Sequence, residues 1–225
     1  MCFSTSASFG AGVILAVIGV ASIKKAKSPS ATFFASIPLI FSFQQFTEGF
    51  VWLSLSNPTY AFLQQISTYT FLFIAQVIWP TWVPLSIFLL EKKSKRKIIQ
   101  KILIGIGIMV SAYLGFCLLS YHVEAKIMSY HISYELDFPV FLSKYGSIFY
   151  IIATIAPSYF SSIKRMWMLG TAILISYIIS TIFYTDYVVS VWCFFASIIS
   201  LTVFIIIYEM NKSSQTVPSP TSANV

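Results

Sequence analysis

Two amides and a carboxylate stand close together in QQFTEGF, a segment that begins at Gln44 inside an otherwise apolar stretch. A helical repeat of 100° per residue places Gln45, Glu48 and Trp52 on one stripe, with Gln44 at its edge. An ionisable side chain within a bilayer costs about 2.5–3.5 kcal/mol if nothing meets it. We therefore expect Glu48 to face protein or a cavity. It is either protonated and bonded between helices, or ionised against a bound cation or amine.

Gln76 lies just before a second unusual segment, which contains Pro80 and Pro84. A proline inside a helix removes a backbone donor and clashes with the preceding turn, so the segment is expected to kink or break. Freed carbonyls of a broken helix can line a binding cavity. The pattern predicts a ligand site in which Gln76 joins the polar stripe described above. A proline kink that is simply packed against its neighbours is the alternative.

Thiols, imidazoles and one carboxylate form a second candidate site. In the expected topology, one face of the membrane gathers Cys2, Glu48, His122, His131 and Cys193, residue types that bind zinc or copper. A disulfide such as Cys2 to Cys193 is another outcome on an oxidising face. The alternatives are free, buried cysteines, Cys117 among them, and histidines with structural or surface roles.

Several familiar activities are excluded. Residues 188–208 contain no lysine, so a retinal Schiff base on that helix is ruled out. The chain has 2 histidines, so a zinc hydrolase site built from three histidines cannot form. The motifs HExxH, GxSxG and GxxxxGK[ST] are also absent from the sequence.

The composition is that of a membrane protein. Hydrophobic residues make up 57% of the 225 residues and charged residues 9%, with a mean hydropathy of +0.83. The lipid bilayer is therefore the expected partner. The net charge of +7 comes from short basic clusters between apolar runs rather than from one helical face. Such clusters set membrane topology and do not indicate binding to nucleic acid.

Seven apolar runs are long enough to cross a bilayer as helices. They cover residues 7–23, 31–55, 60–90, 98–120, 145–163, 166–184 and 188–208. We expect an all-α integral membrane protein with one seven-helix domain over residues 1–210 and a disordered cytoplasmic tail over residues 211–225. The weakest run is 60–90, which could be a helix plus a re-entrant piece.

The basic clusters also predict the orientation. Lysines follow the first run directly and none precedes it, which is the reverse of a cleavable signal peptide. Because lysine and arginine concentrate on the cytoplasmic side, the amino terminus is expected outside and the carboxyl terminus in the cytoplasm. The expected location is the cytoplasmic (inner) membrane of a bacterium, and no oligomeric state is indicated.

Three separated motifs carry a resemblance to a known family. They are MCFSTSASF at the start, IPLIFSFQQFTEGFVWLSL from Ile37, and SVWCFFASIIS from Ser190. The chain resembles an uncharacterised bacterial family of multi-pass, seven-helix membrane proteins whose members begin Met-Cys-Phe-Ser. The resemblance implies this fold and no particular mechanism.

These observations leave three hypotheses for function. The first is a polar cavity in the outer half of the bundle that binds a small molecule or a cation for transport or sensing. The second is an intramembrane enzyme that uses a metal or a thiol on a lipid or an envelope substrate. The third is a structural scaffold whose polar groups serve only helix packing.

Overall fold

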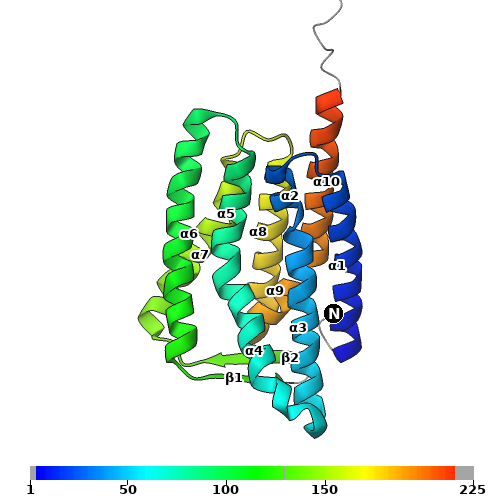
Figure 1. Ribbon diagram of the computed structural model, residues 1–225. Coiled ribbons are helices and arrows are strands. Elements are labelled where there is room, and N and C mark those ends of the chain that lie inside the picture. The colour runs from blue at the N-terminus through cyan, green and yellow to red at the C-terminus, as the bar shows by residue number, and fades with distance from the viewer. Residues whose placement is uncertain (1–3, 129, 216–225) are drawn as a thin grey trace, which may run out of the picture.

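A computed structural model of the chain shows a bundle of long helices with a short β-hairpin across one end (Figure 1). It describes residues 4–128 and 130–215, apart from the side chains of 140–146, 186, 193–194 and 213–215. The longer helices are α1 (Thr5–Lys25), α3 (Ile37–Ser56), α4 (Gln64–Phe73), α5 (Trp79–Leu90), α6 (Ser94–Ser120), α7 (Val140–Tyr159), α8 (Met166–Phe183) and α10 (Ala196–Gln215). The shorter elements are α2 (Pro29–Ala35), η1 (Pro58–Leu63), η2 (Ile74–Ile78), η3 (Thr185–Tyr187) and α9 (Val188–Phe194), with strands β1 (Val123–Met128) and β2 (His131–Leu136).

Five helical segments in the described part of the chain are long and apolar enough to cross a membrane. They are Thr5–Lys25, Pro58–Leu90, Ser94–Ser120, Met166–Phe183 and Val188–Lys212. The expected crossings at 31–55 and 145–163 are not among them. Polar residues lower the hydropathy of α3, and Ser147–Tyr159 of α7 is a shorter apolar helix. The outer surfaces support a membrane protein, because large apolar side chains such as Val17, Met109 and Ile182 are exposed there.

The helical run from Pro58 to Leu90 is continuous, so the expected break is absent. It starts as the 3₁₀ turn η1, continues as α4, widens into the π-helix η2 and ends as α5. Pro84 lies inside α5 without ending it. The expected single helix over 31–55 is instead divided at Ser36 into α2 and α3. The division precedes Pro38, which has no N–H to continue the hydrogen-bond ladder.

The β-hairpin departs from the all-α prediction. Strands β1 and β2 pair antiparallel, with Val123 opposite Leu136 and Met128 opposite His131. The inward side chains of β1, Val123 and Ala125, are buried and alternate with partly exposed neighbours. This hairpin lies in the connection between the predicted crossings at 98–120 and 145–163. At the carboxyl end, α10 continues to Gln215, past the predicted end at residue 208. Residues 216–225 of the predicted tail lie outside the described part.

The two ends of the bundle are formed by different connections (Figure 1), and their charged residues differ. Residues 24–28, 91–101 and 160–165 gather at one end, here called the basic end. Its exposed cations include Lys24, Lys25, Lys27, Lys92, Lys93, Lys95, Lys164 and Arg165. The opposite end, here called the hairpin end, carries residues 121–139. Between the two ends a large apolar core includes Phe34, Trp79, Ile87, Met166 and Ile207.

Candidate functional site

The π-helix η2 places Gln76 in the middle of a widened helical turn. Pro80, four residues later, has no N–H, and in an α-helix its ring would meet the Gln76 carbonyl. A π turn is a known local response to such a misfit and often occurs at functional sites. Outside donors serve the neighbouring carbonyls: Tyr150 Oη donates to Ala75 O at 2.6 Å, and Ser111 Oγ donates to Val77 O at 2.6 Å.

A cavity of about 390 Å³ lies inside the bundle beside this π turn. Its walls come from α3, η2, α5, α6, α7, α8, α9 and α10, and Leu136 and Phe138 from the end of the hairpin also contribute. The volume falls within the roughly 300–1,000 Å³ of small-molecule pockets. Its described lining is mostly apolar and aromatic, with no Asp, Glu, Lys, Arg or His among its side chains.

Two glutamine amides supply polar atoms to the cavity wall. Gln44 is fully buried, and its Oε1 accepts a hydrogen bond from Trp79 Nε1 at 2.8 Å. Gln76 is 8% exposed, and its Oε1 is buried without a hydrogen-bond partner among the described residues. Tyr113 Oη, also at the wall, lies against the Cys117 thiol one turn along α6. Buried polar atoms are normally paired, so Gln76 Oε1 marks where a bound group would be satisfied.

Aromatic rings form much of the remaining wall. Phe41 stacks on Trp79 with ring centroids 4.0 Å apart. Trp192 meets Tyr150 at 5.6 Å and Tyr177 at 5.4 Å, both edge to face. Trp192 is held in place because its Nε1 donates to Ser176 Oγ at 3.0 Å. These contacts fix the rings in defined orientations before any ligand binds.

Glu48 is fully buried, but it is not part of the cavity lining. Ser190 Oγ on α9 donates to Glu48 Oε1 at 2.5 Å, and Gln45 Nε2 donates to Glu48 Oε2 at 3.2 Å. The carboxyl group therefore connects α3 to α9. Of the predicted ligand residues, Gln44 and Gln76 lie together at the cavity, whereas Gln45 and Glu48 form this separate network.

Trp52 lies apart from both groups. It belongs to a small apolar cluster with Val51, Ala125 and Ile132, where α3 meets the hairpin. Its Nε1 is buried with no acceptor among the described residues. The helical stripe that joined Trp52 to Glu48 in the sequence is therefore divided between a polar network and an apolar contact.

The residues of the predicted metal site are only partly described. No group of three or more His, Cys, Asp or Glu residues that could hold a metal occurs within the described residues. His122 is exposed, while His131 packs against Tyr184 and Tyr187 with centroids 5.3 and 4.6 Å away. Burial lowers the pKa of His131. Cys2 and the side chain of Cys193 lie outside the described part, so the predicted disulfide remains a prediction, and Cys117 is a buried free thiol.

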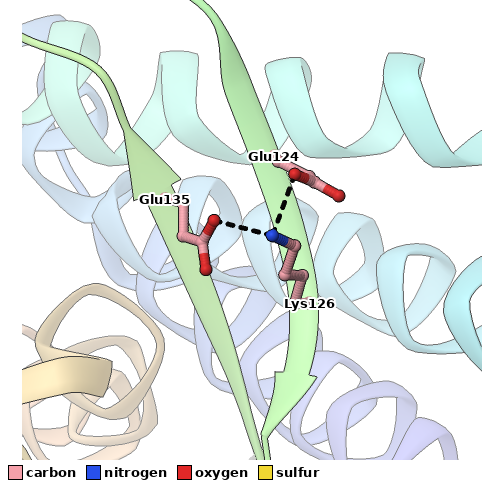
Figure 2. A network of polar contacts seen from close by, with 3 residues as sticks. All are labelled: Glu124, Lys126 and Glu135. Atoms are coloured by element: carbon pink, nitrogen blue, oxygen red, sulfur yellow. Dashed lines mark hydrogen bonds and ion pairs between the residues drawn. The ribbon is translucent and has the colours of Figure 1, made fainter.

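An ion-pair cluster clips the two strands of the hairpin together (Figure 2). Lys126 Nζ lies 2.7 Å from Glu135 Oε2 and 3.0 Å from Glu124 Oε2. The hydrogen bonds that Lys126 Nζ donates to Glu135 and then to Glu124 raise the pKa of Lys126. The ion pair between Lys126 and Glu135 joins the two strands, and the second strand ends at the cavity residues Leu136 and Phe138.

The sequence did not indicate the tyrosines of the wall, because Tyr113, Tyr150 and Tyr177 lie on three different helices. Their spacing along the chain carries no signal. Gln44 on the polar stripe and Gln76 before two prolines were the predicted residues that pointed to this region.

Comparisons with known proteins identify a family. A family model described as a family of unknown function (DUF6629) matches residues 1–219. No curated protein and no solved structure matches the chain.

Proposed function

This chain belongs to the DUF6629 family, and we propose that it is a seven-helix protein of the bacterial inner membrane that binds a small molecule for transport or sensing. The ligand occupies the cavity beside the π-helix η2. The observation that carries the proposal is the unpartnered Gln76 Oε1, buried at the wall of a cavity of about 390 Å³. Broken or widened helices next to a polar cavity are a recurring feature of membrane binding sites.

The remaining features support binding rather than packing alone. A cavity of this size would lower stability if it existed only for packing, because lost contacts and empty volume both cost free energy. Its polar groups converge from α3, η2 and α6, while fixed aromatic rings form the walls. This combination of apolar walls and a few oriented polar atoms is typical of small-molecule sites.

The seven-helix topology is supported by charge. With α3 and α7 as crossings in addition to the five long apolar segments, the basic end faces the cytoplasm and the hairpin end faces outward. The cavity then reaches the hairpin end through Leu136 and Phe138, and extends along the bundle as far as Leu169 near the start of α8.

Filling the cavity tests this function. The full chain in lipid nanodiscs is screened against small organic molecules by thermal shift, together with Ile173→Trp and Ile175→Trp. Ile173 lines the cavity and Ile175, two residues along α8, is 51% exposed on the outside. We expect compounds that stabilise the wild type to lose their effect in Ile173→Trp and to keep it in Ile175→Trp.

A screen in which no compound stabilises the wild type would favour a scaffold and reject the proposal. So would ligands that stabilise both tryptophan variants equally. Thr181→Leu, which adds less volume at another cavity residue, separates loss of binding from misfolding of Ile173→Trp.

A further inference from the structure

Some polar atoms of the cavity wall have hydrogen-bond partners within the described protein, and one buried oxygen does not. Gln44 Oε1 is satisfied by Trp79, and Tyr150 Oη is engaged with Ala75 O. Gln76 Oε1 is an acceptor in a residue more than nine-tenths buried, and it has no donor within the described part of the chain. A ligand that donates one N–H or O–H would complete it.

The charge of the lining restricts the ligand further. Every described lining side chain is neutral, so neither an anion nor a cation would find an opposite charge there. Burying an ion without a counter-charge is far more costly than burying a hydrogen-bonded neutral group. The wall therefore favours an uncharged molecule.

The shape of the wall favours a ring. Phe41 and Trp79 form one stacked pair, and Tyr150, Tyr177 and Trp192 form an edge-to-face cluster. Planar aromatic molecules gain stacking and edge-to-face contacts on such surfaces that a flexible chain does not gain.

We propose that the ligand is a flat, uncharged ring compound that donates one N–H or O–H group to Gln76 Oε1. This inference rests on the proposed function and specifies the class of molecule that the same cavity accepts.

Matched probes test the donor. Binding of indole, which has one N–H, is compared with benzothiophene, which has the same flat shape and no N–H, and with the benzyltrimethylammonium cation. The affinities are measured on the full chain in nanodiscs. We expect indole to bind about tenfold more tightly than benzothiophene, the usual size of one buried hydrogen bond. The cation is expected to bind more weakly than indole.

Two variants assign the effect to Gln76. Gln76→Met removes the acceptor and keeps a side chain of similar length. We expect this variant to bind indole and benzothiophene with about equal affinity. Gln65→Met changes an exposed glutamine of α4 on the same helical run and should keep the full preference.

The outcomes separate the inference from the proposed function. Equal binding of indole and benzothiophene to the wild type, stronger binding of the cation, or an unchanged preference in Gln76→Met would overturn the ligand class. If all three probes fail to bind while other compounds still require the open cavity at Ile173, the ligand class is wrong and the proposed function stands. Loss of every cavity-dependent ligand would reject both.

Discussion

Glu91 ties two loops of the basic end together through one buried carboxylate. Its Oε1 accepts hydrogen bonds from the backbone N–H groups of Lys92 and Lys93 at 3.0 and 2.9 Å, and also from Ser162 Oγ. Its Oε2 accepts from the Ser162 N–H at 2.6 Å. Arg96 adds a hydrogen bond to the Ser161 carbonyl. The carboxylate also lies at the amino end of α6, where the helix dipole favours a negative charge.

These contacts predict how stability depends on pH. Burial acts to raise the pKa of Glu91, but hydrogen bonds from Ser162 and from the backbone of Lys93 and Lys92 outweigh it and lower the pKa below 4.5. The stabilisation is therefore complete above the unfolded pKa and is lost as pH falls through the lower folded pKa. At pH 7, Glu91→Gln should lower the free energy of unfolding by roughly 1–3 kcal/mol.

Thermal unfolding between pH 3 and 7 measures this effect. The difference between wild type and Glu91→Gln should shrink as the solution becomes acidic. Ser162→Ala removes one donor to the carboxylate. As the pH is lowered, this variant should therefore begin to lose stability at a higher pH than the wild type. A difference between wild type and Glu91→Gln that stays constant over the whole range would contradict this account.

At the scale of single residues, the sequence indicated which groups are unusual but not what they contact. Glu48 was predicted to face protein or a cavity, and it is fully buried and bonded to Ser190, which lies 142 positions along the chain. Ser190 could not be predicted as the partner of Glu48, because serine is common in apolar helices. Gln44 and Gln45 are adjacent in sequence, yet one faces the cavity and the other faces Glu48.

At the scale of elements, α5 and α6 approach unusually closely around a freed carbonyl. Pro84 has no N–H for the Pro80 carbonyl four residues earlier. That carbonyl points at Gly107 of α6, where a Cβ would lie only 1.9 Å from the oxygen. Serine and threonine add to the contact, since Thr81 Oγ1 and Ser111 Oγ are 2.8 Å apart. The absence of a side chain at Gly107 is what lets the two helices meet here.

Gly107→Ala should therefore destabilise the protein by about 1–3 kcal/mol, because the two backbones must separate. Gly105 lies on the same helix with nothing within 4 Å of its Cβ position. Gly105→Ala should be neutral or stabilising by up to about 1 kcal/mol, through helix propensity alone. Denaturation of both variants in matched detergent measures the difference. Equal stability of the two would show that the contact between α5 and α6 is looser than described.

The same scale shows which elements could be predicted. Long apolar runs predicted α1, α6 and α8 to within four residues at each end, because the length of a membrane helix is set by the bilayer. The hairpin was missed, although β1 has a period-two burial pattern that six residues were too few to make decisive. Two prolines predicted a kink or a break at 79–84, and the helix instead stays continuous with a π turn just before Pro80.

At the scale of the whole molecule, the separation of charge between the two ends is the property that was most predictable from sequence. Lys and Arg clusters that are far apart in the chain meet at one end (Figure 1). There Arg165 pairs with Glu209 at 3.3 Å, and Asn211 Nδ2 donates to the Lys25 carbonyl at 2.5 Å. The cavity could not be predicted in the same way, because its walls depend on how eight helical elements and the end of the hairpin pack, which no local pattern encodes.

The orientation is testable with single cysteines placed at the two ends. In a background without the native cysteines, Lys95→Cys reports on the basic end and Tyr130→Cys on the hairpin end. Both positions are exposed, Tyr130 at 74%. If lysine and arginine keep the basic end in the cytoplasm, a membrane-impermeant maleimide should label Tyr130→Cys in intact bacteria and leave Lys95→Cys unlabelled. After the membrane is permeabilised both should react, which controls for accessibility. Labelling of Lys95→Cys in intact cells would reverse the orientation and place the hairpin, together with the end of the cavity that reaches it, on the cytoplasmic side.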